Sequence, residues 1–460
     1  MIKSARHNPN LSLFQVPPTD LSTVSSRWVK IPPLTSSITP IQIYIDKQSD
    51  LIDLSRSFVE IDVGFKTTAG GNLTSRNDDV GRMTSFANNL AHTLFKQINA
   101  KCNGMLLTEQ VDMYHHKAYL QTLLNNDRND GDTILQATNG GWRNEIDSPV
   151  TYTATNVKGD NAAFAALSDN QQASIKAQKK EARDLYSEGK RRILRMKPFV
   201  EIFHQGKWIV PRTSFEMDFY LNPASIFSNG ESNLPTESMR VHADDVKLSF
   251  YMCLVKLNPS TYMDMMGLLS KSAALYPFVR TEMRQYSLDN GATYKEINNP
   301  FNNKVPQRFV LAIVENSAFN DRYDQDTFAY QPAGIEYIKQ IVDGEEYPYE
   351  TLELNTGNGR KDVRGYYRFL EATGCLQRGS GNMVRFLDWG YGKNATIFAF
   401  SNVPNGRHDD PILLPRPQST INLRLKCAAQ QSQKTIILMS EYEALIEIDG
   451  INSTTSMSVH

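Results

Sequence analysis

The chain has 460 residues, with 49 Lys and Arg against 50 Asp and Glu, and a formal net charge of −1. This balance argues against a protein whose main task is to coat nucleic acid, because such a protein needs a large positive excess. The length favours two domains, and a chain of this size can bury enough apolar surface to fold without disulfides or metal ions.

The four cysteines show no pattern of chemistry. Cys102, Cys253, Cys375 and Cys427 lie tens of residues apart and have no metal-ligand spacing. We therefore expect buried, reduced thiols in an intracellular setting. The first ten residues lack the apolar core of a signal peptide, and no apolar run predicts a membrane span.

The first part of the chain predicts an arm followed by strands. Residues 1–24 carry scattered Pro, Ser and Asn and are expected to form an N-terminal arm. Alternating apolar and polar residues predict strands at IQIYI (41–45) and FVEIDVGF (58–65). Asn103-Gly104 predicts a hairpin turn because both residues accept positive φ, and residues 113–124 then change to a helical period.

Residues 161–192 differ from their surroundings. The segment is rich in Ala, Gln, Lys and Glu and has no Pro. It predicts a helical insertion that projects from the first β domain, because its apolar residues are too sparse for a buried helix. Strand patterns return at SFEMDFYL and DDVKLSFYMCLVKL, and an Asn-Pro-Ser signal predicts a linker helix at 258–272.

A buried strand and an unusual loop follow in the second half. The run FVLAIV (309–314), between Pro306 and Asn316, predicts a strand buried on both faces. The segment from there to Tyr330 is polar, acidic and aromatic, and has no period. A catalytic site, a metal site or a contact with a partner could each explain such a loop, and its aromatic residues are typical of protein–protein contacts.

The two halves repeat one order of features. The first half contains, in order, the turn segment CNGMLL, a helix, a strand led by VPRT and a long final strand. The second half contains the turn segment VDGEEYP, a helix, a strand led by LPRP and a long final strand. From Gly104 to Pro211 there are 107 residues, and from Gly344 to Pro415 there are 71, a difference of 36 that the insertion at 161–192 roughly fills. The repeat predicts two copies of one sandwich, and their long connections favour jelly rolls.

Signals of catalysis or ligand binding are weak. DWGYGKNA (388–395) contains a GxGxxA, but a strand pattern follows it where a dinucleotide site needs a helix. DRYDQD (321–326) lacks the Gly and Glu of a calcium loop and is expected to be solvated. His115 and His116 are adjacent and would diverge on a helix, and KRRILRMK (190–197) is interpreted as part of a mixed-charge helix face. We predict no catalytic, cofactor or metal site.

Over most of its length the chain resembles the double jelly-roll major capsid proteins of Polinton/Maverick elements and adintoviruses, relatives of adenovirus hexon. The matching stretches are LSLFQVPPTDLSTVSSRWVKIPPL, DLIDLSRSFVEIDVGF, LFKQINAKCNGMLLTEQVDMYHHKAYLQTLL, YPFVRTEMRQYSL, the segment from VPQRFVLAIV to VDGEEYP, and NLRLKCAAQQSQKTIILMSEYEALIEID. The insertion at 161–192 and the segment CLQRGSGNMVRFLDWGYGKNA depart from the pattern.

The resemblance implies a mainly β fold of two tandem jelly-roll sandwiches, with short helices and a helical insertion in the first. We expect a first jelly roll at 25–257, a linker helix at 258–272, a second jelly roll at 273–450 and a C-terminal tail at 451–460. The implied function is structural and not enzymatic. Three copies would form a pseudo-hexagonal capsomer, and the loop after FVLAIV would be a subunit contact or an outer crown loop.

The implied partners are neighbouring capsomers and penton or minor capsid proteins, with the encapsidated DNA contacted only indirectly. The chain would be made inside the host cell and end in an icosahedral virion capsid. Two other functions stay open from the residues alone. A two-sandwich carbohydrate-binding or attachment protein would need exposed aromatic platforms, and a β-sandwich glycosidase would need two well-placed carboxylates.

Overall fold

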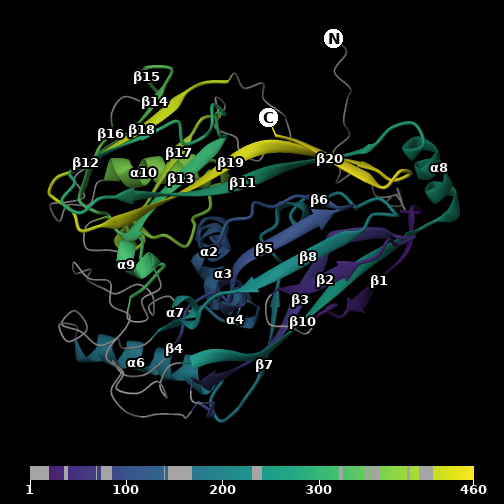
Figure 1. The fold of residues 1–460 in the computed structure, drawn as a ribbon, viewed down its shortest axis with the longest axis horizontal. Helices are drawn as coiled ribbons and strands as arrows, with labels where there is room; N and C mark the ends of the chain where they lie inside the picture. The colour runs from purple at the N-terminus through teal and green to yellow at the C-terminus, as the bar shows by residue number, and fades with distance from the viewer. Residues whose placement is uncertain are drawn as a thin grey trace, which may run out of the picture.

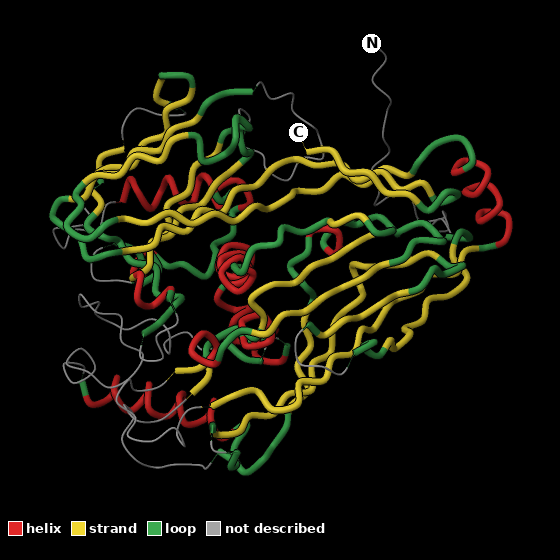
Figure 2. The backbone as a smooth tube through the Cα atoms, viewed as in Figure 1, coloured by secondary structure: helices red, strands yellow, loops and turns green. Residues whose placement is uncertain are grey.

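The computed structural model describes residues 20–35, 40–68, 70–73, 85–138, 140–142, 168–229, 241–320, 325–347, 352–354, 363–390, 394–403 and 418–459. Within these residues, strands form four antiparallel sheets of four or five strands and a two-stranded ribbon (Figures 1 and 2). The prediction of a mainly β fold is confirmed.

The first half of the chain forms one sandwich from two sheets, with strand orders β1-β10-β3-β7 and β2-β8-β5-β6. The strands are β1 Thr23–Ile31, β2 Ile41–Ile45, β3 Leu51–Thr67, β5 Phe95–Cys102, β6 Met105–Leu106, β7 Arg192–Met196, β8 Phe215–Leu221 and β10 Val241–Leu257. The ribbon pairs β4 Ser85–Phe86 with β9 Ser228–Asn229.

The second half forms another sandwich, with strand orders β11-β19-β13-β17 and β12-β18-β14-β15. The strands are β11 Ala274–Leu288, β12 Tyr294–Asn298, β13 Arg308–Glu315, β14 Ile335–Val342, β15 Glu345–Glu346, β17 Ile397–Ser401, β18 Ile421–Cys427 and β19 Lys434–Asp449. Two further strands join these sheets: β16 Leu352–Glu353 beside β14 and β20 Thr454–Val459 beside β19.

Helices are short and lie mainly in the connections between strands. In the first half they are α1 Leu90–Thr93, α2 Tyr114–Asn125, α3 Arg128–Asp132, α4 Ile134–Ala137, α6 Asp169–Asp184, the 3₁₀ helix η3 Glu201–Phe203 and α7 Ala224–Phe227. In the second half they are α9 Asn316–Phe319, α10 Val363–Ala372, α11 Cys375–Arg378 and η5 Phe386–Asp388. The helix α8 Pro259–Leu269 joins the halves, and Asn258 caps it by accepting a hydrogen bond from the Ser260 N–H.

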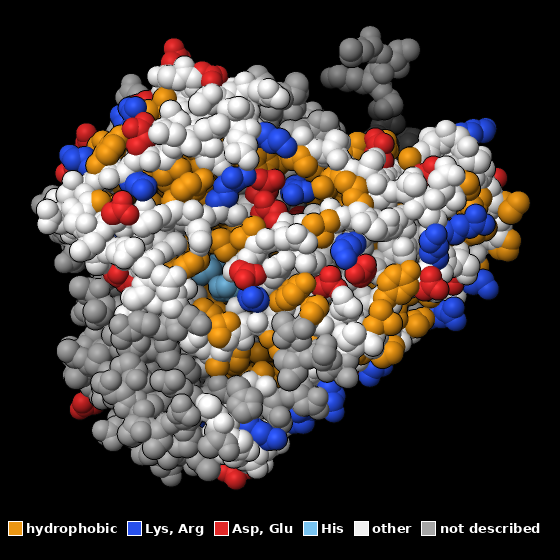
Figure 3. All heavy atoms as spheres, viewed as in Figure 1, with side chains coloured by type: hydrophobic (Ala, Val, Ile, Leu, Met, Phe, Trp, Pro, Cys, Tyr) orange, Lys and Arg blue, Asp and Glu red, His pale blue; other side chains and the backbone are white. Residues whose placement is uncertain are grey.

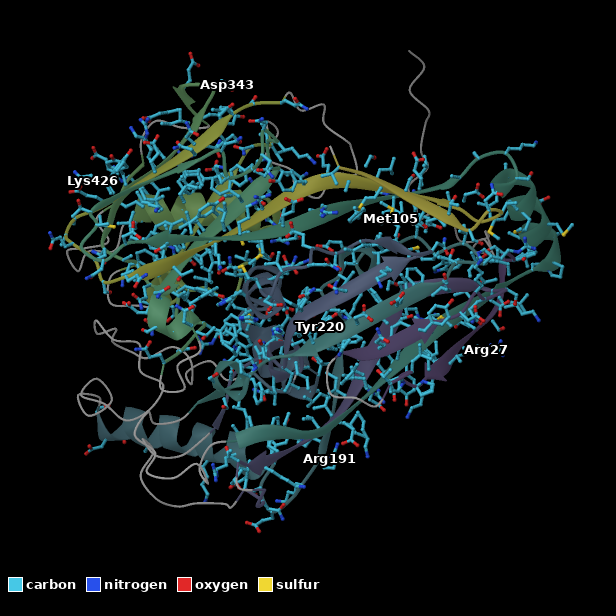
Figure 4. The ribbon with its side chains drawn as sticks, viewed as in Figure 1. Arg27, Met105, Arg191, Tyr220, Asp343 and Lys426 are labelled. Atoms are coloured by element: carbon cyan, nitrogen blue, oxygen red, sulfur yellow. The ribbon has the colours of Figure 1, made fainter. Side chains whose placement is uncertain are left out.

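The two halves have the same topology, as the sequence repeat predicted. Strand by strand, β1, β10, β3 and β7 correspond to β11, β19, β13 and β17, and the second sheets correspond in the same way. The hairpins β5–β6 and β14–β15 both turn on a pair of residues with positive φ, Asn103-Gly104 and Asp343-Gly344. Figure 4 labels Met105 and Asp343 at these two hairpins. The fold is a double jelly roll.

The hydrophobic cores of the two sandwiches share side chains. The core of the first contains Tyr276, Ile446 and Ile448, which come from β11 and β19 of the second. The core of the second contains Tyr119 and Leu123 from α2 of the first. Figure 1 shows α2 between the two groups of strands. The halves are therefore joined by apolar packing as well as by α8.

The helical insertion is less separate than predicted. Of the segment 161–192, residues 161–167 lie outside the described part, and α6 begins at Asp169. The expectation that the insertion stays out of the core is wrong at its C-terminal end, because the Tyr186 ring packs against Phe65 and Phe86 with ring centroids 5.0 and 4.9 Å apart. The buried Tyr186 ring, with Ala182 and Ser187 buried beside it in the sequence, anchors a segment whose average composition is polar.

The two ends of the chain differ from the predicted arm and tail. Residues 1–19 of the predicted arm lie outside the described part, and β1 already begins at Thr23. The predicted tail at 451–460 is wrong as a description of Thr454–Val459, because β20 pairs with β19 and Met457 packs against the first core. The remaining domain boundaries stay a prediction.

Candidate functional site

The loop after β13 joins the two sandwiches of one chain. Residues 325–333 are buried, although the sequence predicted a surface loop here. The Phe328 ring stacks on Tyr119 of α2 with centroids 4.2 Å apart, and it lies edge-on to His116 at 5.6 Å. The interpretation of these residues as a subunit contact or crown loop is therefore wrong. The aromatic spacing of Phe328 and Tyr330 signalled a protein contact, but that contact lies within the chain.

Charged side chains from the first sandwich cap the free edge of β11. Its edge position leaves backbone N–H groups without a strand partner. The Thr281 N–H donates to Glu201 Oε1 at 3.1 Å, and the Met283 N–H donates to Glu109 Oε2 at 2.9 Å. Lys117 Nζ lies 2.5 Å from the same Glu201 oxygen. These bonds cover an edge that would otherwise be open to a further strand.

A groove of about 390 Å³ runs along this junction and is lined by both halves, including Gln121, Glu201, Thr281, Arg308 and Glu441. Figure 3 shows acidic and basic side chains side by side near the centre of this face. Arg308 Nε and Nη2 each donate to Glu441 at 2.9 Å, and Glu201 pairs with Lys117. The charges of the groove thus neutralise one another, which suits a structural contact better than acid–base catalysis.

His115 and His116 lie at the same junction, buried in α2. The His116 ring stacks on Phe319 of α9 with centroids 5.4 Å apart, and neither of its nitrogens has a hydrogen-bond partner among the described residues. Burial lowers the pKa of His115 to about 3 and holds the pKa of His116 well below its usual value. Both rings are therefore neutral at pH 7 and serve as packing groups.

The remaining sequence candidates have structural roles. Asp326 of DRYDQD is buried and accepts from the Phe328 N–H at 2.9 Å, whereas residues 321–324 lie outside the described part. After DWGYGKNA comes the predicted strand, β17. The prediction of a mixed-charge helix face at 190–197 is wrong, because strand β7 forms there. Arg191, just before β7, pairs with Asp62 of β3, and Arg195 of β7 pairs with Glu60 of β3.

The cysteines are buried, as predicted. Burial raises the pKa of Cys102 and of Cys427 to about 11, so both thiols are protonated at neutral pH. Among the described residues, no three His, Cys, Asp or Glu side chains gather in a metal-binding cluster. Within the same ranges, every helix is too short or too polar to span a bilayer.

Sequence reasoning missed the residues that join the halves. Glu201 and Glu109 lie 80 and 174 positions from the β11 residues whose N–H groups they accept from, and Lys117 lies 84 positions from its partner Glu201, so no local pattern marks them. The one available signal was that the segment after β13 is rich in aromatic as well as polar residues, with Phe319, Phe328 and Tyr330 among them.

No protein-family model matches the chain. An uncharacterized protein of Caenorhabditis elegans is 19% identical over 368 residues, which cover 79% of each of the two chains.

The solved structures give a longer match. A chain of the Sputnik virophage has a TM-score of 0.59 at 11% identity, covering 100% of this chain and 93% of its own. The mavirus major capsid protein has a TM-score of 0.53 at 10% identity, with coverage of 100% and 96%. The Faustovirus major capsid protein has a TM-score of 0.51 at 9% identity, with coverage of 94% and 92%. The chain therefore has the double jelly-roll fold of viral major capsid proteins.

Proposed function

We propose that the protein is a major capsid protein, a structural subunit that forms trimers with a pseudo-hexagonal outline and builds an icosahedral shell around double-stranded DNA. The main support is that the fold match runs over the whole chain: the mavirus major capsid protein aligns with 100% of this chain and 96% of its own. A match of this length includes both sandwiches and their junction, and not one sandwich that many functions could use.

The charge and packing of the chain agree with this function. A net charge of −1 limits repulsion between many copies in one shell. The paired charges along the junction and the capped edge of β11 give a rigid building block with two fixed sandwiches. Such a block suits a role that depends on shape.

We further propose that the lineage is that of Polinton/Maverick elements and adintoviruses. Its partners would be neighbouring capsomers and penton or minor capsid proteins, and DNA would be contacted only indirectly. The protein would be made inside the host cell and end in the virion. The division at α8 into residues 25–257 and 273–450 is part of the same proposal.

The carbohydrate-binding alternative has less support. Trp142 and Trp389 are buried, so they cannot act as platforms for sugar rings. Trp28 lies in β1 and Trp208 lies in the loop before β8. Both are partly exposed, but they come from different elements. A glycan array screened with the purified chain would reveal such binding.

Light scattering of the purified full chain tests the proposed assembly. We expect a mass about three times the 52.0 kDa of one chain at micromolar concentration. A monomeric mass under these conditions would contradict the proposed trimer.

A further inference from the structure

The helices α2 and α10 come at the same point in the order of elements of the two halves, but only α2 is covered. The helix α2 follows the hairpin strand β6, and α10 follows the hairpin strand β15 and the short strand β16; each helix precedes the edge strand of its half, β7 or β17. In α2, ten of the twelve residues are buried, because the second sandwich packs over the helix. The equivalent covering for α10 is missing within the described part of the chain.

The inner face of α10 is fixed by close packing. A Cβ atom at Gly365 would lie 2.6 Å from both Leu354 and Trp389, so this side of the helix must face its own sandwich. The opposite side exposes Val363 by 64% and Tyr367 by 54%. Leu376 of α11 and Leu387 of η5 are also exposed, and η5 is held beside α10 by the Tyr366 and Phe386 rings, 5.3 Å apart. We call these four exposed residues the α10 patch.

The strands β1 and β11 form a second unequal pair. Each is the edge strand beside the long central strand of its half, β10 or β19. The free edge of β11 is capped by Glu109 and Glu201, and Gln121 of α2 donates a hydrogen bond to the Thr281 hydroxyl at 3.3 Å. In contrast, β1 has exposed residues along most of its length, including Val24 at 60% and Trp28 at 50%. An exposed edge strand with apolar side chains is a site at which another chain can dock.

We propose that β1 of a second copy docks on the α10 patch, so that the contact made within the chain by β11 and α2 is repeated between chains. This inference rests on the proposed trimer and identifies its contact surfaces. The contact is heterologous, with a different surface on each partner, and such a contact closes into a ring when the rotation between copies allows it. Every copy in a closed ring would then cover both of its open surfaces.

The positions and charges of the two surfaces agree with a ring. Figure 1 shows β1 at the lower right and α10 at the upper left among the strands of the second sandwich, and in Figure 4 Arg27 of β1 lies on the side away from the second sandwich. The cations at both surfaces already have acidic partners: Arg27 lies 3.7 Å from Asp50, and Arg368 lies 2.8 Å from Glu371. Like charges therefore oppose the docking only weakly.

A photo-crosslinker placed at position 28 of the full chain tests this contact. Trp28 is half exposed, so its replacement by benzoylphenylalanine leaves the core intact. Mixing isotopically heavy and light chains identifies crosslinks between copies. We expect the intermolecular crosslinks to fall within residues 363–390. Intermolecular crosslinks to other segments would overturn the proposal.

Charged substitutions give a second readout, with a matched control. Tyr367→Glu and Leu387→Glu should each raise the protein concentration needed for half-assembly at least tenfold, while Met263→Glu on the exposed face of α8 should leave it unchanged. Circular dichroism checks that each variant is folded. If a variant does not fold, the crosslinking experiment on the otherwise unmodified chain decides whether the proposed contact exists. A trimer that both variants of the α10 patch leave intact would refute this contact but not the trimer, whereas a monomeric unmodified chain would refute the proposed trimer itself.

Discussion

The carboxylate of Glu201, in the first sandwich, accepts a hydrogen bond from the backbone N–H of Thr281, in the second, at 3.1 Å. The same oxygen lies 2.5 Å from Lys117 Nζ, and both charged side chains are about 10% exposed. One carboxylate therefore accepts a hydrogen bond from the edge of β11 and also neutralises a nearly buried cation. Since no other strand pairs with this edge of β11 among the described residues, the contact helps to hold the halves in one orientation.

Removing the Glu201 carboxylate should be strongly destabilising. Glu201→Ala leaves Lys117 charged and largely buried without its partner, and breaking such a pair typically costs about 3–5 kcal/mol of unfolding free energy. Urea unfolding at a fixed protein concentration measures the change. Asp112→Asn removes the exposed pair with Lys96 and serves as the control. Equal, small effects of both substitutions would mean that the Glu201 contact does not stabilise the junction.

Glu109 should behave differently from Glu201 when the pH changes. Burial raises the pKa of Glu109 above its ordinary value of 4.5, so its contribution to stability is greatest below pH 4.5 and is lost as the pH rises through the folded-state pKa. Glu109→Gln keeps an oxygen that can accept from the Met283 N–H and removes the titration. We compare the unfolding free energy of this variant with that of the unmodified chain. We expect the difference to be more favourable to the variant at pH 7 than at pH 4. Urea unfolding at both pH values measures this difference, and a relative gain at pH 4 would contradict it.

Acid should destabilise the folded chain through its buried histidines. Burial lowers the pKa of His92 and of His115 to about 3, and that of His116 well below 6.5. Their contribution to stability is complete above pH 6.5 and is lost as the pH falls from 6.5 toward the folded-state values. Each histidine adds up to about 1.4 kcal/mol per pH unit in this window.

His116→Phe tests this origin of the acid sensitivity. A phenyl ring can keep the stacking on Phe319 and cannot take up a proton. The dependence of the unfolding free energy on pH between 6.5 and 4 should become less steep by about one proton, and stability at pH 7 should not fall. An unchanged slope would show that His116 is already protonated, or exposed, in the folded chain.

Phe328 should be a core residue and not a surface one. It is 2% exposed and stacks on Tyr119 across the junction. Phe328→Ala should lower the unfolding free energy by about 3–5 kcal/mol, the usual range for a buried phenylalanine. Tyr347→Ala, in a residue that is 40% exposed, is the control and should stay within about 0.5 kcal/mol. A small loss at Phe328 would mean that residues 325–333 leave the junction in solution.

The sequence contained enough local information for most of the framework. Period-two patterns located β2 and β3, a strand pattern located β8, and the Asn103-Gly104 turn has the positive φ values that the residue pair predicted. The apolar run at 309–314 is β13, whose residues from Phe309 to Glu315 are all buried. The repeat of features between the halves was the strongest signal, because the strand orders of the two sandwiches agree throughout.

Contacts between distant segments could not be predicted in the same way. The burial of residues 325–333 depends on α2, which lies about two hundred positions earlier in the chain. Tyr186 and β20 were misjudged because a single aromatic ring, or a six-residue strand, adds little to a composition or a period. The caps of β11 depend on side chains of Glu109 and Glu201 that resemble any exposed glutamate in the sequence.

Electron microscopy of the purified full-length protein is the most direct test of its role as a capsid subunit. If the two sandwiches of each chain stand side by side around a threefold axis, class averages should show particles with three copies and six similar lobes. Single particles of one two-lobed chain at micromolar concentration, or assemblies without threefold symmetry, would contradict the proposed function.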